Sequence, residues 1–529
     1  MIWHIFRKDL KLLWPLVLIV AAVQVLNAVL WLVLGNFGEP ESLGRIASLF
    51  IIAVLLGIGA LIVTVVHQDT VPGDRQDWLV RPIRRRDLLL EKLLFVLATV
   101  HGPILLVDLV HCMATGFTFG VSLSAALSRN IYLLIFFSLP ILALAAMTST
   151  IIEVIGSVLA ACLLAVVFMI SIQAVTNVPA GLTFPTMSNA FLMLEFWQAV
   201  LLVAAVIIIP LQYFRRATVR ARALALGAVL ILIPISASIP WTSAFAFLQW
   251  LSPDPAAAKA VTVAFDPALG KKTLKPGSAA RANSVWLPLH VSGLAPDSIV
   301  LKDRAYIRII GQDGATLFQG LSIGDPQTTG NSSASAVDDF PARTTTAGDV
   351  RTYQLFSLPW KIYELVRNQP VRLHVDYALT LFHVNASDTI PALDGDQQIV
   401  RFGRCKTKID DEGDDVEIGC LTAGNPSNCA TLVLENTVSG QHNPPFNFCS
   451  KSYLPYNAHF SPNAMLHAGL DLPFRDLQGL AKYPVDSTQL ANARVLFKAY
   501  EPVAHFTRRL IIPEIRLGDW EANVEGASP

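Results

Sequence analysis

Charged residues are scarce in this chain. They make up 15% of its 529 residues, whereas soluble domains usually carry about 25%. Apolar residues make up 53% of the chain, and its mean hydropathy is +0.50. This composition argues against an ordinary soluble protein and indicates a membrane protein.

The scarcity of charge is confined to the first half of the chain. Residues 1–250 are mostly apolar runs with 15 Lys and Arg against 11 Asp and Glu, whereas residues 251–529 hold 25 against 29 and have an ordinary globular composition. The formal net charge of zero is therefore an average over a basic half and an acidic half. Because nucleic acids bind basic surfaces, the acidic half argues against a nucleic-acid partner.

The chain also lacks the common motifs of catalysis. It contains no G-x-S-x-G, no H-E-x-x-H and no G-x-x-x-x-G-K-[ST] string. The nearest approach to the phosphate-binding loop is Gly270-Lys271-Lys272-Thr273, which lacks the first glycine. We therefore expect that the chain is not an enzyme and carries no catalytic residue, metal or cofactor of its own.

Seven apolar runs are long enough to cross a membrane, which takes roughly 20 residues for about 30 Å of hydrocarbon. The first run is too long for a signal peptide, and no small-residue cleavage site follows it. The fourth and fifth runs are nearly contiguous and predict a tight hairpin. We predict a polytopic α-helical membrane domain over residues 1–250, with about seven spans. They lie near 12–34, 46–66, 93–115, 130–149, 152–175, 193–213 and 223–242.

Lys and Arg are distributed unevenly between the predicted loops. With the N-terminus inside, the inside segments hold 13 basic residues, and the outside loops hold only Arg45 and Arg129. Cytoplasmic loops of membrane proteins carry such an excess. We therefore expect a multi-pass protein of a bacterial inner membrane, with a cytoplasmic N-terminus. Seven spans then place residues 251–529 outside, in the periplasm or extracellular space.

Four of the six cysteines cluster in the second half, which supports this topology. An even set of cysteines in an extracytoplasmic domain indicates two disulfides. We predict the pairs Cys405–Cys420 and Cys429–Cys449, because each closes a local loop. A metal site is the alternative, but the spacings include no C-x-x-C and do not fit a zinc ribbon or finger well.

The second half shows the alternation of β-strands. Apolar and polar residues alternate in 284–294 and 372–384, and Gln312-Asp313-Gly314 is a hairpin signal within 304–320. A last strand is predicted at 506–517, where Pro513 requires an edge or a bulge. We predict a mainly-β, sandwich-like extracytoplasmic domain over residues 251–529, with a short helix near 357–367.

Several features of the membrane half resemble the membrane subunit of ABC-2-type transporters. The opening MIWHIFRKDLK suits the family's interfacial helix, or else a polar region that only orients the first span. The 67–92 loop is the longest inside loop and ends in RPIRRRDLLLEKLL. The family's proline turn and its lysine entering the third span find matches at Pro82, Arg84, Arg85 and Lys92. The resemblance covers about residues 1–215.

The resemblance implies the permease subunit of an ATP-driven exporter. ATP and Mg would bind a separate cytoplasmic ATP-binding cassette subunit, and the 67–92 segment would be the coupling loop. A homodimer or a paired permease is expected, because one such chain is half a transporter. The chain departs from the family in its seventh span with an outside domain, since six spans are usual. The family's acidic residue after span two has its nearest candidate in Asp69.

The resemblance also places the ATPase contact in the coupling loop. Trp78 and Leu79 would supply apolar anchors, as aromatic residues often do at interfaces. The charged rim would consist of Asp74, Arg75, Asp77 and Arg81. The alternative is that the basic cluster only fixes topology, which accounts for a membrane anchor but not for Trp78. The anchor of span three would consist of Arg84, Arg85, Arg86 and Lys92.

Asp108 is the most conspicuous ionisable residue in a predicted span, and His101 and His111 flank it. A charged group at membrane depth is costly and suggests a functional intramembrane polar site, in a substrate pathway or between helices. A position near the outer end of the span, from which the side chain reaches water, is the alternative.

Two other classes of protein compete with a transporter. One is a multi-span, membrane-anchored extracytoplasmic binding or scaffold protein, although seven spans exceed the need of an anchor. The other is a membrane-embedded enzyme, although the spans lack the paired His, Asp or Ser-Lys groups of such chemistry. In either case the lipid bilayer is a partner, and the outside domain is suited to receive substrate or to dock an envelope protein.

The predicted topology is tested with a membrane-impermeant thiol reagent on intact cells. We expect the cysteines of residues 405–449 to be labelled only after reduction, because the disulfides protect them. Labelling without reductant would contradict the disulfides, and labelling only after lysis would place the domain inside.

Overall fold

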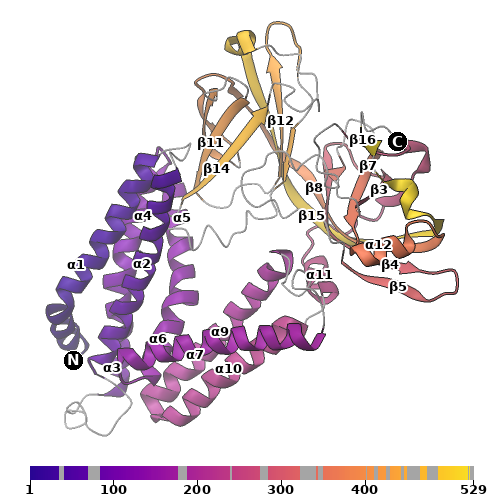
Figure 1. Ribbon diagram of the computed structural model, residues 1–529. Helices are drawn as coiled ribbons and strands as arrows, with labels where there is room; N and C mark the ends of the chain where they lie inside the picture. Colours follow the sequence, from indigo (N-terminus) through magenta and orange to yellow (C-terminus); the bar gives the residue numbers. More distant parts are fainter. Residues whose placement is uncertain are drawn as a thin grey trace. The chain divides into compact units, whose positions relative to one another are not determined.

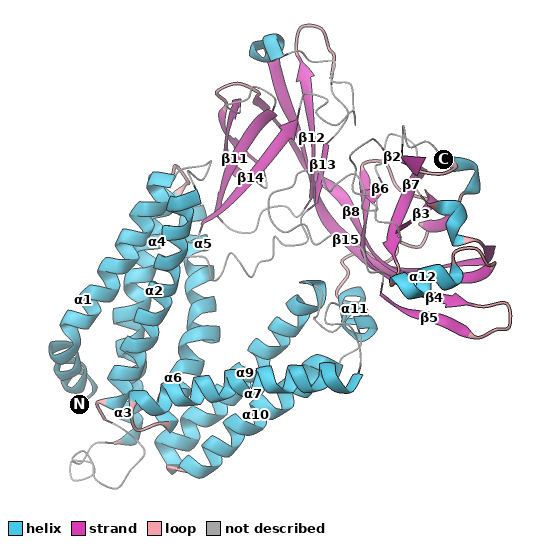
Figure 2. Cartoon of the chain, in the orientation of Figure 1, coloured by secondary structure: helices cyan, strands magenta, loops and turns pink. Residues whose placement is uncertain are grey.

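The chain folds into two compact units (Figures 1 and 2). The helical unit comprises Met1–Ile239 with Cys420–Asn425 and Tyr453–Ala468. The mainly-β unit comprises Pro240–Gly419, Pro426–Ser452 and Gly469–Pro529. The structure, a computed structural model, describes residues 1–34, 41–69, 84–176, 187–238, 241–274, 284–321, 341–342, 349–400, 402–409, 415–423, 429–442, 446–449, 465–473, 487–521 and 523–524.

Long helices follow one another through the first unit. The first two are α1 (Ile2–Leu34) and α2 (Glu41–His67). Two continuous stretches come next, α3 (Arg85–Val96), η2 (Leu97–His101) and α4 (Gly102–Ala114), then α5 (Phe119–Leu133), η3 (Leu134–Ser138) and α6 (Leu139–Met147). The last are α7 (Ile151–Thr176), α9 (Met187–Arg215) and α10 (Thr218–Ser238).

Five of these stretches are long and apolar enough to cross a membrane. They are Ile2–Val33, Leu49–His67, Arg85–Ala114, Phe119–Met147 and Gln198–Arg215, and they overlap the first four predicted spans and the sixth. The remaining two predicted spans fall on α7 and α10, so membrane crossing by these two stays a prediction. The predicted hairpin is confirmed, because a short turn joins α6 to α7.

The first helix shows how a membrane span forms from this sequence. Phe6, Leu13 and Val20 recur at a spacing of seven and pack into the core of the unit, while Leu12 and Leu18 are exposed. A helix that is apolar all round and half exposed suits a lipid surrounding. Residues 2–11, for which we expected an interfacial helix or a polar region, form the first turns of α1 itself.

Two π-helical segments interrupt the third and fourth stretches. Each segment, η2 and η3, is followed two residues later by a proline, Pro103 and Pro140. Proline cannot donate a hydrogen bond and clashes with the carbonyl four residues earlier. A wider turn just before the proline relieves this conflict without breaking the helix.

The second unit is built from two stacked sheets and smaller additions. The seven-stranded sheet has the order β13 (Phe446–Cys449), β12 (Cys429–Asn436), β15 (Ala493–Ile515), β8 (Val371–Pro391), β4 (Ser298–Ile310), β5 (Thr316–Leu321), with β6 (Pro341–Ala342) on β4. The three-stranded sheet has the order β1 (Thr262–Phe265), β3 (Ser284–Ser292), β7 (Val350–Ser357).

Two further sheets lie outside this pair. One has the order β14 (Met465–Pro473), β11 (Asp415–Ala423), β10 (Gly403–Ile409), β9 (Asp396–Ile399). The other pairs β16 (Asn523–Val524) with β2 (Thr273–Leu274) in parallel.

A single core joins the three-stranded sheet to the larger sheet. Leu287 and Leu289 of β3 share it with Leu373 and Val375 of β8. In β8 these residues alternate with more exposed ones such as Arg372, which is the pattern of a sheet with one buried face. The mainly-β prediction is therefore confirmed, and the shared core is that of a sandwich.

The predicted local signals of the β unit are confirmed. β4 and β5 form a hairpin in which Gly314 has φ 81°, a conformation that favours glycine. Pro513 lies at a register shift between Ile512 and Ile515, as expected for a bulge. The predicted helix is α12 (Trp360–Val366).

Disulfide bonds in this half are confirmed as well. Cys405, Cys420 and Cys429 are disulfide-bonded, while Cys112 and Cys162 are free. β10 and β11, which carry the first two, are neighbouring strands. Cys429 lies opposite Cys449 in the ladder of β12 and β13. Both arrangements favour the predicted pairing, although the side chain of Cys449 lies outside the described residues.

The boundary between the units lies before α11 (Trp241–Trp250) rather than after residue 250. The ring of Phe245 packs edge-on against that of His505 on β15. The backbone N–H of His505 donates to Ser252 Oγ at 2.8 Å. These contacts attach α11 to the β unit, because each joins it or its following turn to β15.

Arg508 of β15 donates hydrogen bonds to residues 258–261, the segment that leads into β1. Its Nε donates to the carbonyl oxygen of Val261 at 2.6 Å, and its Nη2 donates to that of Ala258. Both carbonyl-bearing residues are buried in the core. Unpaired buried carbonyls cost roughly 1–3 kcal/mol each.

We therefore expect Arg508→Met to lower the free energy of unfolding by about 1–3 kcal/mol. The measurement is thermal unfolding of the full-length protein in detergent. The matched control is Arg509→Met, because Arg509 is exposed and pairs with Asp376 at the surface. Equal effects of the two substitutions would contradict the assigned role of Arg508.

Candidate functional site at the basic end of the helical unit

The predicted coupling residues lie outside the described residues. Trp78 and Leu79 fall in the 70–83 gap, together with the rest of the predicted contact, Asp74, Arg75, Asp77 and Arg81. The structure does describe both sides of this gap, where α2 ends and α3 begins. We call this region, with the beginning of α1 and the end of α9, the basic end of the helical unit.

The three arginines that precede and open α3 are exposed, as a membrane anchor requires. Arg84, Arg85 and Arg86 are all on the surface. Arg85 Nη1 also donates to the carbonyl oxygen of Phe214, near the end of α9, at 2.7 Å. A cation at a helix C-terminus is favourable because the last carbonyls carry partial negative charge. Arg85 is thus placed to hold the end of α9.

Lys92 differs from these arginines, because its side chain is fully buried. Its Nζ donates to Asp9 Oδ2 at 2.5 Å and to Asp69 Oδ2 at 2.8 Å. The exposed fraction of the Lys92 side chain is 0% and that of Asp9 is also 0%. Lys92, which we predicted with the three arginines as an anchor of span three, thus differs from them in its surroundings. Its charge is neutralised inside the protein and is not presented to headgroups or water.

We call Lys8, Asp9, Asp69, Glu91 and Lys92 the lysine cluster. Its members are the seventh and eighth residues of α1, the second residue after α2, and the seventh and eighth residues of α3. The phenol of Tyr213, near the end of α9, is buried close to the same charges. α1, α3, α9 and the turn after α2 therefore meet at this cluster. In the chain, α2 and its turn precede the 70–83 segment and α3 follows it.

Asp69 shows how strongly the lysines act on the cluster. Burial works against ionisation of this carboxyl, but the positive charges of Lys92 and Lys8 outweigh it and hold the pKa of Asp69 below its usual range. Lys8 Nζ lies 3.3 Å from Asp69 Oδ1. Asp69 is thus ionised at neutral pH and pairs with the lysine that enters the third span.

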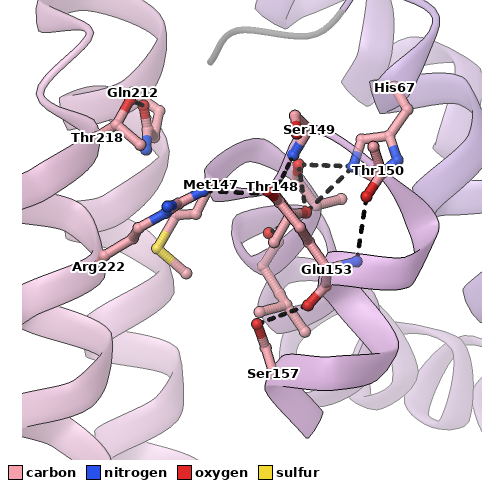
Figure 3. Close-up of polar contacts among 12 residues, drawn as sticks. His67, Met147, Thr148, Ser149, Thr150, Glu153, Ser157, Gln212, Thr218 and Arg222 are labelled. Carbon is pink, nitrogen blue, oxygen red and sulfur yellow. Dashed lines mark hydrogen bonds and ion pairs between the residues drawn. The ribbon is translucent and has the colours of Figure 1, made fainter. Parts of the chain in front are cut away.

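A second group of polar side chains in the helical unit joins α2, α6, α7 and α10 (Figure 3). His67, the last residue of α2, is bonded through Nε2 to the carbonyl oxygen of Ala145 at 3.2 Å and to Thr148 Oγ1 at 3.1 Å. Because a carbonyl oxygen only accepts, Nε2 carries the proton. The end of α2 is thereby tied to the end of α6.

Arg222 of α10 closes the turn between α6 and α7 (Figure 3). Its Nε and Nη2 both donate to the carbonyl oxygen of Met147, at 3.1 and 3.0 Å. The turn itself is a capping box, in which the N–H of Glu153 donates to Thr150 Oγ1 and the N–H of Ser149 donates to Glu153 Oε2. Arg222 Nη2 also lies 3.4 Å from Glu153 Oε2.

Asp108 is buried and paired with a basic residue. Arg129 Nη1 donates to its Oδ2, and the exposed fractions are 2% for Asp108 and 6% for Arg129. Arg129, which we predicted in an outside loop, instead lies inside α5. The structure thus favours bonding between helices for Asp108, because a pair of opposite charges is the cheapest way to bury either one.

Another polar chain links the two π-helical segments. Asn130 Nδ2 donates to the carbonyl oxygen of His101 at 2.8 Å, and His101 Nε2 is 3.0 Å from Ser138 Oγ. His101 ends η2 and Ser138 ends η3. Asn130 also bonds the other ring nitrogen of His101. These polar side chains are thus bonded within the protein, where lipid offers no partner.

Several of these partners escaped sequence reasoning. Asp9 is the lone acidic residue of the basic opening segment, and Glu91 directly precedes Lys92. In both places the signal in the sequence was an acidic residue next to basic ones. Asn130, Ser138 and Tyr213 carry no such signal. Their roles depend on which helices pack together.

In class, the chain is a multi-span α-helical membrane protein with a mainly-β C-terminal region, because five of its helices have the length and composition of spans. No family model and no curated protein matches it.

The burial of Lys92 gives a direct test of the lysine cluster. We expect Lys92→Ala to lower the free energy of unfolding by about 3–5 kcal/mol, because it leaves Asp9 and Asp69 buried without their cation. Thermal unfolding of the full-length protein in detergent measures the loss.

The matched control is Arg86→Ala, which removes an exposed cation less than two turns away on the same helix. We expect it to change the free energy of unfolding by less than about 1 kcal/mol. A Lys92→Ala protein as stable as this control would show that the cluster does not hold the helices together.

Proposed function

We propose that this chain is the membrane permease subunit of an ATP-driven exporter of the ABC-2 type. In this proposal the 67–92 segment receives the motion of a cytoplasmic ATPase and passes it to the membrane helices. ATP and Mg bind the ATPase subunit, and the permease acts as a homodimer or beside a second permease. The proposal extends to an inner-membrane location, with the β unit outside.

The observation that carries the proposal is the lysine cluster at the base of the 70–83 segment. Asp69 precedes this segment and Lys92 follows it, and the two are hydrogen-bonded at 2.8 Å. A segment whose two ends are bonded together moves its flanking helices as one body. Because Asp9 joins the same lysine, displacement of the segment would move α1 along with α2 and α3.

The group around His67 supports the same mechanism. His67 ties the last turn of α2 to α6, and Arg222 ties α6 to α10. Motion received by α2 would therefore reach the second half of the helical unit through bonded helix ends. This arrangement suits a device that converts a push at one end into rearrangement of several helices.

The residues that we propose to grip the ATPase are Trp78, Leu79 and Arg81, with Asp74, Arg75 and Asp77 around them. The exposed arginines beside them need no partner protein, since a lipid surface is sufficient for Arg84–Arg86. The resemblance implies an acidic residue just after the second span. Asp69 supports this part of the resemblance, because it lies after α2 and contacts Lys92.

A membrane-anchored binding or scaffold protein is the second candidate. The observation in its favour is the β unit, which has its own large core and would carry out binding by itself. A scaffold role gives no reason for the helix ends to be bonded to one another around a long basic loop. The two candidates differ in whether a cytoplasmic ATPase binds.

Copurification tests the proposal. We expect a cytoplasmic ATPase to copurify with the unaltered full-length chain, and its recovery to fall on the order of tenfold with Trp78→Ala or Arg81→Glu, because hot-spot residues at interfaces contribute this much or more. The measurement is the ATPase recovered per mole of permease.

The control is Arg86→Glu, which reverses an exposed charge outside the proposed grip and should leave recovery unchanged. Absence of an ATPase from the unaltered chain would favour the scaffold. Full recovery with both Trp78→Ala and Arg81→Glu would move the contact away from these residues.

A further inference from the structure

The charges of the lysine cluster do not balance. Among the described residues, two ammonium groups, Lys8 and Lys92, face three carboxyl groups. Asp9 and Asp69 each accept a hydrogen bond from Lys92, and Lys8 lies 3.5 Å from Asp9 and 3.3 Å from Asp69. The two lysines are therefore matched by two aspartates, and Glu91 remains.

Glu91 is the least satisfied member of the cluster. Its side chain has an exposed fraction of 0%, and neither carboxyl oxygen has a hydrogen-bond partner among the described residues. Oε2 lies 3.2 Å from Lys92 Nζ, an ion pair that lacks the geometry of a hydrogen bond, and the same ammonium donates to Asp9 and Asp69. A fully buried carboxylate with no donor carries a large free-energy penalty.

Binding a proton removes this penalty. A neutral carboxylic acid costs far less to bury than a carboxylate, and it leaves two negative charges against two positive ones. A metal ion is not favoured, because the described residues contain no group of three His, Cys, Asp or Glu side chains arranged to hold one.

We propose that Glu91 is a proton-binding site and that the lysine cluster holds one proton there at neutral pH. The groups that face it come from every helix packed around it. They are Lys8 and Asp9 of α1, Asp69 after α2, Lys92 of α3 and Tyr213 of α9. Loss of this proton places a third negative charge in the cluster and loosens the junction of α1, α2 and α3.

The consequence for transport rests on the proposed function. If the cluster passes motion from the ATPase to the helices, release of the proton weakens that connection and makes coupling depend on cytoplasmic pH. The proton site itself requires neither transport nor an ATPase. Its test is therefore made on the purified full-length chain alone.

Infrared spectroscopy detects the proton directly. A protonated carboxyl has a carbonyl stretch that is separate from carboxylate and amide bands and that shifts in D₂O. We expect the native protein in lipid nanodiscs at neutral pH to show such a band and Glu91→Gln to lose it. Asp87→Asn, which alters a carboxyl one turn earlier on α3, is the matched control and should keep the band.

Thermal unfolding provides a second measurement. A carboxyl that binds its proton more tightly in the folded state makes stability fall as pH rises from mildly acidic to mildly alkaline. We expect this fall in the native protein and in Asp87→Asn, and a flatter profile in Glu91→Gln. Asp69, whose pKa lies below its usual range, lowers stability only toward acid, so the two effects occupy different pH ranges.

Defined outcomes overturn the proposal. Identical carboxyl bands in the native protein and Glu91→Gln would show that Glu91 is ionised. Unfolding that responds to Na⁺ or K⁺ against choline at fixed pH, with a pH profile indifferent to Glu91→Gln, would assign the site to a metal cation. If Glu91→Gln does not fold, Glu91→Asp replaces it, and an unshifted carboxyl band in that variant overturns the proposal.

Discussion

Everything at the basic end of the helical unit depends on the burial of one ammonium group. Lys92 is fully enclosed, and the free-energy cost of removing it from water is offset because its ammonium donates hydrogen bonds to the carboxylates of Asp9 and Asp69. Asp9 comes from α1 and Asp69 from the turn after α2, so both pair with Lys92 only when α1, α2 and α3 are assembled. The ion pair therefore forms only when the three helix ends pack together.

The same physical rule organises the interior of the spans. Polar groups in a membrane helix need partners within the protein, because lipid supplies none. Asp108 finds Arg129, and His101 finds Asn130 and Ser138. The side chain of Asn130 also donates to the backbone carbonyl oxygen of His101, where the first π-helical segment ends. These pairs join helices to one another and need not mark the path of a substrate.

The β unit is stabilised differently. Its long strands β8 and β15 pair along most of their length, and their alternate apolar residues build a core shared with a second sheet. Disulfide-bonded cysteines lie on strands of the smaller and larger sheets. Buried polar pairs join the helices of the membrane unit, whereas an apolar core joins the sheets of the β unit. The first arrangement suits a lipid surrounding and the second suits water.

The sequence by itself determined the two-part organisation, five of the spans, the β character, the hairpin at Gly314 and the bulge at Pro513, because each follows from local hydrophobicity or from the backbone limits of glycine and proline. It also singled out Asp108, and the family resemblance drew attention to Lys92. Only the tertiary structure decided that Lys92 is enclosed by acids, that Arg129 is Asp108's partner inside a helix, and that Glu91 accepts no hydrogen bond from any described residue. Partners across helices are set by packing and depth, and neither quantity is encoded in the spacing of residues along one segment.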